Sequence, residues 1–214
     1  MTLQRWTPAF CLLLASVKVV WLRLLLYSDT CRTFGSGVLE PFIGSGFYVR
    51  SDCPFTLTRF THNRVECDIT IQRGNSGLLV QVEIIVNKVS TVLQNGIILV
   101  EKKSVSLPYD HTYQHIFQYG IYTRLRSSLL PLSVTWHSVP GGIDTLWVRL
   151  EQELSTDMTG LCGKHNVTGN EQQLITESVI ADSTCQIQDP AFVPNPVGLH
   201  FFVFSVSTYK VVTE

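Results

Sequence analysis

The sequence predicts an all-β protein, either a sandwich or a barrel of antiparallel strands that disulfides hold together. Short runs in which apolar and polar residues alternate recur along the chain, and turns rich in Gly, Asn and Pro separate them. No stretch between residues 31 and 165 has a convincing helical period of apolar residues. The six cysteines are widely spaced and none forms a Cys-x-x-Cys pair, which disfavours zinc and favours structural disulfides.

Residues 1–28 have the pattern of a secretory signal peptide. One early charge, Arg5, precedes an apolar run at residues 8–17, and this order is typical of such leaders. Lys18 and Arg23 interrupt the apolar residues that follow, so neither apolar run reaches the ~18 to 20 residues that span a bilayer. An uncleaved signal anchor is the alternative. We therefore expect a secreted, extracellular chain with no membrane contact unless the leader is retained.

Five cysteines follow the leader, and Cys11 of the leader is left out of the disulfide framework. Spread-out cysteines in a secreted chain are more often structural disulfides than metal ligands. Because five is an odd number, at least one thiol is free or pairs with another chain. The five are Cys31, Cys53, Cys67, Cys162 and Cys185.

Strand-like runs follow one another through the body of the chain. Asn95-Gly96 between two apolar runs is a strong hairpin signal, because both residue types accept a positive φ. The run 78–89 is interpreted as one strand, and Pro140-Gly141-Gly142 supplies a later turn. Strands are predicted at 47–50, 55–60, 67–72, 78–89, 91–93, 97–100, 104–107, 116–125, 132–136 and 145–150.

The character of the sequence changes after Asn166. The polar segment that follows is predicted to hold one or two helical turns around residues 177–181, whereas residues 199–206 form a bare apolar run. Such a run on a protein surface is an aggregation hazard. It therefore either packs as an extra strand or is a tail foreign to the domain.

The charge of the chain argues against one class of partner. Charged residues make up 15% of the sequence and the formal net charge is −1. Binding to a phosphate backbone or to an anionic membrane surface needs a surplus of basic residues. We expect no nucleic-acid partner.

Three stretches, with two shorter segments between them, follow one another in an order that is typical of one protein family. They are Cys31-Arg32-Thr33-Phe34-Gly35 with Phe42-Ile43-Gly44 and Phe47-Tyr48, then Cys53-Pro54-Phe55-Thr56-Leu57, Leu107-Pro108, Leu132-Ser133-Val134-Thr135-Trp136, and Gly160-Leu161-Cys162-Gly163 with Asn166. Together they resemble the von Willebrand factor type D family of gel-forming mucins, otogelins and related extracellular proteins. The resemblance implies an antiparallel, disulfide-stapled β-sandwich with short helical turns near its C-terminal end. It places the domain at residues 29–195, and residues 196–214 remain an apolar tail of uncertain status.

The resemblance also implies how the cysteines pair. The family joins its first cysteine to the one in Gly-Leu-Cys-Gly, here Cys31 to Cys162. It joins the cysteine of the aromatic strand to a later one, here Cys53 to Cys185. A disulfide that closes a loop as long as the first stabilises a fold by about 4 to 5 kcal/mol in the chain-entropy model.

Cys67 is then the remaining cysteine. Alternation places its side chain on the same face as Ile69 and Ile71, which indicates a buried position. A free, buried thiol is one interpretation. A bridge to another chain is the other, and it would give a disulfide-linked oligomer.

The loop after Gly-Leu-Cys-Gly is a candidate site for calcium or for a glycan. Type D domains commonly hold calcium there, and the resemblance implies Asn166, Asn170 and Glu171 as the surviving oxygen ligands. Lys164 adds a positive charge and Ile43 stands in the turn that supplies a carboxylate in the family, which weakens the site. Asn166 also begins the sequon Asn-Val-Thr, and a glycosylated amide cannot ligate an ion directly. We favour a glycan over calcium at Asn166.

No catalytic site is indicated. His111 and His115 are four residues apart, but the glutamate of a His-Glu-x-x-His site is missing and the segment is typical of loop and strand. The chain has no Gly-x-Ser-x-Gly elbow, phosphate loop or nucleotide fingerprint. Trp136 and Trp147 are expected in the core and not as ligand platforms.

These patterns predict a secreted structural or interaction module of the mucus or matrix assembly type, which acts by protein–protein binding and is not an enzyme. The expected partners are other extracellular or mucin-like proteins. The alternative is a soluble secreted inhibitor or carrier that binds one protein partner. The oligomeric state without reductant distinguishes the two functions.

Overall fold

The computed structural model describes residues 29–49, 51–152, 157–163 and 171–180, so the predicted leader and the tail lie outside the described residues. Strands are the dominant regular structure of the described residues, which contain one short helix, and the predicted all-β class is confirmed. Within these residues no helix is long and apolar enough to cross a bilayer. The elements are β1 (Thr30–Phe34), β2 (Val38–Glu40), β3 (Phe47–Tyr48), β4 (Pro54–His62), β5 (Val65–Arg73), β6 (Leu79–Val86), β7 (Val89–Gln94), β8 (Ile97–Val100), β9 (Lys103–Ser104), β10 (Tyr109–Asp110), β11 (Gln114–Tyr119), β12 (Tyr122–Ser127), β13 (Leu132–Val139), β14 (Gly142–Leu150) and α2 (Glu171–Ser178).

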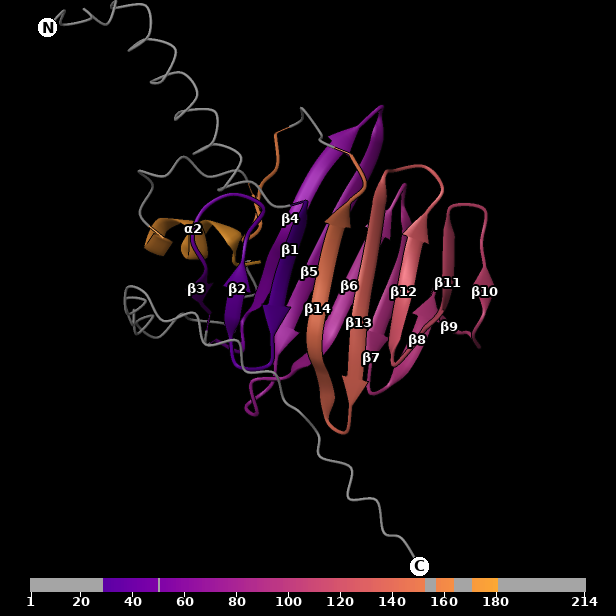
Figure 1. Ribbon diagram of the computed structural model, residues 1–214, viewed down its shortest axis with the longest axis horizontal. Helices are drawn as coiled ribbons and strands as arrows, with labels where there is room; N and C mark the ends of the chain where they lie inside the picture. The colour runs from indigo at the N-terminus through magenta and orange to yellow at the C-terminus, as the bar shows by residue number, and fades with distance from the viewer. Residues whose placement is uncertain (1–28, 50, 153–156, 164–170, 181–214) are drawn as a thin grey trace, which may run out of the picture.

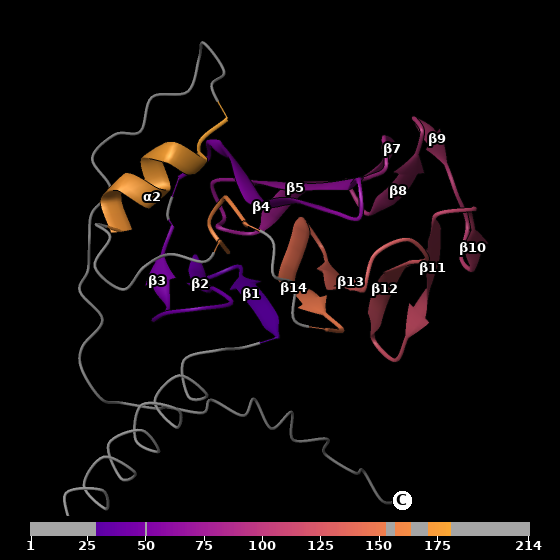
Figure 2. The same ribbon diagram turned by 90° about the horizontal axis from the view of Figure 1, so that it is seen from above.

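The strands form one antiparallel sheet that curls into two packed layers, as Figure 1 and Figure 2 show. The front layer has the order β3-β2-β1-β14-β13-β12-β11-β10, and the back layer has the order β4-β5-β6-β7-β8-β9. The layers join where Ile143 of β14 pairs with Leu79 of β6. This is the expected sandwich, with the two layers continuous through that single pairing.

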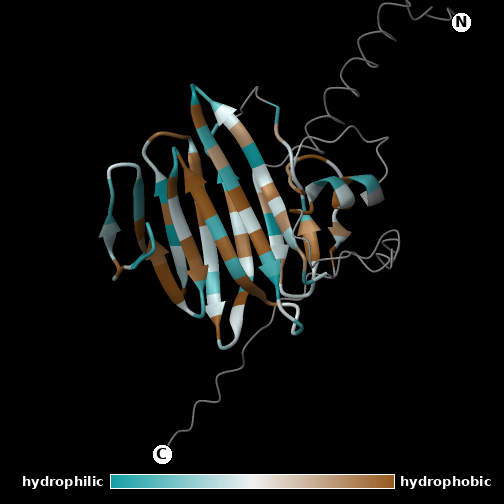
Figure 3. Cartoon of the chain, turned by 180° about the vertical axis from the view of Figure 1, so that it is seen from behind, coloured by the Kyte–Doolittle hydropathy of each residue, from teal (hydrophilic) through white to brown (hydrophobic). Residues whose placement is uncertain are grey.

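The core lies between the layers and is built by alternation along the strands. On β5, Cys67, Ile69 and Ile71 are buried, while the residues between them are partly exposed. Figure 3 shows similar bands of contrasting hydropathy along the neighbouring strands. Burial of one such aliphatic side chain stabilises the fold by about 1.5 to 3 kcal/mol. A shift of the pairing by one residue would turn the buried row outward, so this alternation also defines the register.

Tight two-residue turns connect β4 to β5 and join each pair of successive strands from β6 to β9. The predicted Asn95-Gly96 turn joins β7 to β8, with φ values of 53° and 72°. The prediction of one strand at 78–89 is wrong, because Asn87-Lys88 turns the chain between β6 and β7 with φ values of 49° and 70°. Val89, predicted to begin the turn, instead begins β7. Lysine rarely adopts a positive φ, so pairing of the flanking strands sets this turn against local preference.

Two further strand predictions need correction. The run 116–125 is a hairpin, in which Gly120-Ile121 joins β11 to β12 and the glycine has a φ of 62°. The run 104–107 is mostly a connection, because β9 ends at Ser104 and β10 begins at Tyr109. In both cases the apolar residues continue through a change of direction, so their pattern did not reveal it.

Arg73 holds the start of the front layer to the back layer. Its guanidinium donates to the carbonyl oxygens of Phe34 (2.7 Å) and Gly77 (2.8 Å) and to the hydroxyl of Thr33 (2.5 Å). The side chain is only 3% exposed. Burial lowers the pKa of Arg73 to about 10, which leaves the group charged at neutral pH. The cation is thus held by neutral acceptors on both sides of the layer junction.

Helix α2 lies beside β4 and begins earlier than the helical turns expected at 177–181. Its Ile175 is buried in the core. After the helix, Val179 forms a bridge with Phe55, and the Ile180 N–H donates to the Pro54 carbonyl (2.9 Å). The last described residues are therefore bound to the first residues of β4.

Candidate functional site

The Gly-Leu-Cys-Gly segment lies along the outer edge of β4. Leu161 and Cys162 donate their N–H groups to the carbonyls of Thr56 (3.0 Å) and Leu57 (2.7 Å). Gly160 has a φ of +90°, and a Cβ there would lie 2.7 Å from the Thr56 carbonyl oxygen. The approach therefore requires glycine, and it covers a strand edge that could otherwise pair with another chain.

A disulfide joins this segment to the front layer. Cys31 on β1 is disulfide-bonded to Cys162, with Cα atoms 5.9 Å apart and a sequence separation of 131. Both cysteines are buried. This is the pair that the family resemblance implied, and it connects the first strand of the front layer to the segment that covers the back layer.

Cys53 is buried and disulfide-bonded. It immediately precedes β4, next to the segment where the described residues end. Cys185, its predicted partner, lies outside the described residues. The Cys53–Cys185 pairing therefore stays a prediction.

Cys67 has a free thiol in the core. It lies on β5 between Phe60 of β4 and Val86 of β6, in the middle of the back layer. Burial, with a smaller contribution from the neighbouring Asp68 carboxylate, raises the pKa of the Cys67 thiol well above its ordinary value. A neutral, buried thiol is unreactive, so this geometry favours the free-thiol interpretation over an interchain bridge.

The candidate calcium and glycan residues are mostly beyond what the structure describes. Asn166 and Asn170 lie outside the described residues, and Glu171 is the first residue of α2. Among the described residues, no group of three His, Cys, Asp or Glu side chains could hold a metal ion. Calcium at these positions and a glycan at Asn166 both stay predictions.

The histidines that share a four-residue spacing lie on strands and a turn, as expected. His115 of β11 contacts the carboxylate of Asp110 on β10, and both side chains are largely exposed. His111 lies in the turn between them and accepts from the Tyr113 N–H (3.2 Å). The two histidines are therefore held by different partners and form no joint site.

The outward side of the front layer is rich in aromatic and arginine side chains. Strands β11, β12, β13, β14 and β1 lie side by side, and alternate residues on each point away from the core. Protein interfaces are enriched in these two classes of side chain. We term this surface the aromatic–arginine face; its members are Arg32, Phe34, Phe117, Tyr119, Tyr122, Arg124, Arg126, His137, Trp147 and Arg149.

The rings at the centre of this face contact one another. The ring centroids of Tyr122 and Trp147 are 5.0 Å apart, and those of Tyr122 and His137 are 5.5 Å apart. Arg124 lies over the ring of Tyr119, 3.8 Å from its centroid. These contacts hold large side chains in fixed positions before any partner arrives, which lowers the entropic cost of binding.

Trp147 was predicted in the core, and this prediction is wrong. Its side chain is half-buried on the aromatic–arginine face, and its Nε1 has no hydrogen-bond partner among the described residues. Trp136 is in the core as predicted, only 2% exposed. The two side chains point to opposite faces of the front layer. Trp136 is paired with Leu146, whose side chain points inward, and Trp147 is paired with Thr135, whose side chain points outward.

The outward side of the back layer has a different composition. It carries no aromatic side chain on β5 to β8 in the described chain. Arg59 and Asp68 form an ion pair (2.7 Å) there, and Ser90 donates to Glu83 (2.7 Å). Acidic and small polar residues of this kind are depleted at interface centres. The outward residues are Glu66, Asp68, Thr70, Gln72, Gln81, Glu83, Ile85, Ser90, Val92, Gln94, Ile97 and Leu99.

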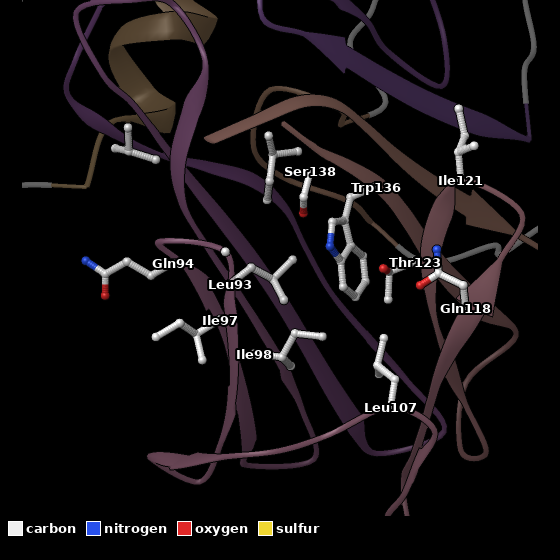
Figure 4. A pocket seen from close by; sticks show the side chains of 13 residues that line it. Leu93, Gln94, Ile97, Ile98, Leu107, Gln118, Ile121, Thr123, Trp136 and Ser138 are labelled. Atoms are coloured by element: carbon white, nitrogen blue, oxygen red, sulfur yellow. The ribbon is translucent and has the colours of Figure 1, made fainter. Parts of the chain in front are cut away.

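A cavity of about 300 Å³ lies between the layers, at the end of the sandwich where the β7–β8 and β11–β12 turns lie. Leu93, Ile98 and Leu107 surround the ring of Trp136, as Figure 4 shows. None of the lining residues carries a titratable group. The cavity therefore suits a neutral group and not an ion.

The residues of the aromatic–arginine face were not recognised from the sequence. Tyr119 and Tyr122 lie on either side of the Gly120-Ile121 turn, inside a run that was interpreted as one strand. Because the turn resets the alternation, a single-strand interpretation assigns them to opposite faces, whereas they are paired on the same face. The glycine itself was the only signal of the turn.

Comparison with known proteins agrees with this architecture. A family model of the von Willebrand factor type D domain matches residues 31–176. Human Mucin-19 is similar, with 26% identity over 184 residues, which covers 83% of this chain and 2% of Mucin-19. The chain thus spans only a small part of that relative's length.

Proposed function

This chain belongs to the von Willebrand factor type D domain family, and we propose that it works as a secreted, extracellular assembly module of the mucin type that binds other proteins and performs no catalysis. The family match and the similarity to Mucin-19 support an extracellular, mucin-like setting. The partners proposed are other mucin-like extracellular proteins. The observation that carries the binding role is the aromatic–arginine face.

This face has the features of a binding surface. Its large rings are exposed to solvent in part, although burial of such rings is what normally stabilises a fold. Truncation of Tyr, Trp and Arg residues accounts for most of the large losses in measured interfaces. The arginines at its margins pair with acids, as in Arg126–Glu151 (3.0 Å) and Arg149–Asp29 (3.1 Å), so the centre is bordered by a polar rim.

The test measures binding of the secreted full chain to two immobilised probes, a second copy of the chain and the matching type D region of human Mucin-19. Y122A/R124A removes two neighbouring residues of the aromatic–arginine face. T70A/E83A removes two residues that are paired on the outward side of the back layer and serves as the matched control.

We expect Y122A/R124A to weaken binding at least tenfold, which corresponds to about 1.4 kcal/mol, and T70A/E83A to change it less than threefold. Equal losses from both variants, or no binding of either probe by the wild type, would contradict the proposal. In the second case a one-to-one complex with a single unrelated protein would instead support the alternative of a soluble inhibitor or carrier.

A further inference from the structure

We propose that the cavity between the layers receives the apolar run at residues 199–206 of the same chain. The cavity lies between the layers, on the inner side of the front layer, whereas the aromatic–arginine face is on its outer side. The tests below do not measure binding to that face, so this inference can fail or hold independently of the proposed binding function. It rests on five features of the molecule: the chemistry of the cavity, its exposed rim, the open edge of β11, the composition of the run and the position at which the chain leaves the domain.

The cavity is neutral and has an apolar floor. Leu93 and Trp136 are buried at its base, and polar uncharged side chains such as Thr123 and Ser138 line its front-layer wall. A site of this kind binds uncharged, largely apolar groups and orients them with a few hydrogen bonds. A phenyl side chain meets these requirements and an ion does not.

The rim of the cavity exposes apolar surface. Ile97 is 48% exposed and Ile121 is 68% exposed, although both are large aliphatic residues. They lie in or beside the turns of two hairpins, one in each layer. Ile97 shares the outward row of Gln94 and so borders the cavity only at its margin, beside the β7–β8 turn. Exposed aliphatic residues at the mouth of a cavity indicate a surface that another apolar group covers.

The edge of the front layer is open beside this rim. Strand β11 pairs with β12 along its whole length but with β10 only at His115 and Ile116. The backbone of residues 117–119 therefore has no strand on its other side among the described residues. An extended segment that enters the cavity can add hydrogen bonds there by strand addition.

The run at residues 199–206 has the composition that the cavity requires. It contains three phenylalanines and no Asp, Glu, Lys or Arg, and it reads Leu-His-Phe-Phe-Val-Phe-Ser-Val. Aromatic and β-branched residues favour an extended strand. Such a run exposed to solvent promotes aggregation, so docking would protect both the run and the cavity rim.

The chain leaves the described domain at the same end of the sandwich as the cavity mouth. The Ile180 N–H donates a hydrogen bond to the Pro54 carbonyl. The strand registers place one residue of each strand from β4 to β8 in a single row across the back layer: Pro54, Gln72, Gln81, Gln94 and Ile97. Four strand spacings amount to about 20 Å. Residues 186–198 alone can span roughly 40 Å when extended, so a Cys53–Cys185 bond would not prevent the docking.

The first test is limited proteolysis of the full chain with chymotrypsin, read by mass spectrometry at Phe201, Phe202 and Phe204. Docking should slow cleavage at these sites at least tenfold relative to a synthetic peptide of residues 197–208. Ser138→Phe fills the cavity and should restore the peptide's rate, whereas Thr70→Phe on the outward side of the back layer should not. Wild-type cleavage at the peptide's rate would overturn the proposal, as would protection that is lost on dilution, since the run would then occupy a second copy.

The second test reads the cavity itself. Methyl resonances of Ile97, Ile98 and Ile121 in the full chain should shift when the three phenylalanines are replaced by serine, and the resonance of Ile85 on the outward side of the back layer should stay. These replacements lie outside the described domain, so its fold provides an internal control. Identical spectra of the wild type and the F201S/F202S/F204S variant at the three cavity methyls would overturn the proposal.

Discussion

The two outer faces of the sandwich arise from the same alternation of residues, yet they differ in chemistry. The front layer presents rings and arginines, and the back layer presents acids, amides, hydroxyls and a few aliphatic side chains. The inner faces of both layers are constrained by packing against each other, so their apolar character needs no other explanation. The outer faces have no such constraint. The aromatic residues of the front layer are therefore explained better by binding than by folding.

The largest expected effect comes from releasing the covalent connection between the layers. C31A/C162A should lower the free energy of unfolding by about 4 to 5 kcal/mol, because the bond closes a loop with a sequence separation of 131 residues. Denaturant titration of the variant, and of the wild type with and without reductant, measures the loss. A change below about 1 kcal/mol would mean that the layers hold together without the bond and that the faces do not depend on it.

The next effect concerns the polar connection at Arg73. Arg73→Met should cost about 2 to 4 kcal/mol, because the carbonyls of Phe34 and Gly77 lose their donor inside the protein. Arg59→Met is the matched control, since that arginine is largely exposed on the back layer and should cost less than about 0.5 kcal/mol. Equal losses measured by thermal denaturation would show that Arg73 contributes no more than a surface ion pair.

Cys67 tests the interior of the back layer. Cys67→Ser should cost about 1 to 3 kcal/mol, because it places a hydroxyl in an apolar site. The native thiol should resist alkylation by N-ethylmaleimide and react after unfolding. Oligomer size should be the same in both proteins. If the variant converted a reducible dimer into a monomer, Cys67 would be the interchain bond.

The buried thiol of Cys67 should also make the free energy of unfolding depend on pH. Burial raises the pKa of Cys67 above its ordinary value of 9.0, so the unfolded chain loses this proton first. The free energy of unfolding of the wild type should therefore fall as the pH rises above about 9, with a contribution of about 1.4 kcal/mol per pH unit. Cys67→Ser should lack this contribution. Parallel stability curves of the two proteins between pH 8 and 10 would contradict a buried thiol.

The smallest effect on stability is expected at the aromatic–arginine face itself. Tyr119→Ala removes the ring under Arg124 and should change the free energy of unfolding by less than about 1 kcal/mol, since both side chains are partly solvated. Chemical denaturation of this variant beside the wild type measures the change. A loss above about 2 kcal/mol would show that the exposed rings stabilise the fold, and the two faces would then not differ in their role.

Sequence patterns predicted the features that local chemistry determines. The Asn95-Gly96 hairpin, the alternation on β5 and the all-β class follow from turn preference and periodicity, and all are present. The Asn87-Lys88 hairpin was missed, because pairing of its two flanking strands sets the turn against the local preference of lysine. The outward side chain of Trp147 was missed, because the pairing of β14 with β13 and β1 decides which face it occupies. The aromatic–arginine face brings together strands from opposite ends of the domain, so no single segment reveals it.

The most direct test of binding through the aromatic–arginine face is hydroxyl-radical footprinting of the full chain, alone and bound to the matching type D region of human Mucin-19. We expect protection of Tyr119, Tyr122 and Trp147 in the complex, with unchanged oxidation of Ile85, Val92 and Leu99 on the back layer. Protection confined to the back-layer residues, or unchanged oxidation of the three aromatic residues in a complex that demonstrably forms, would contradict it.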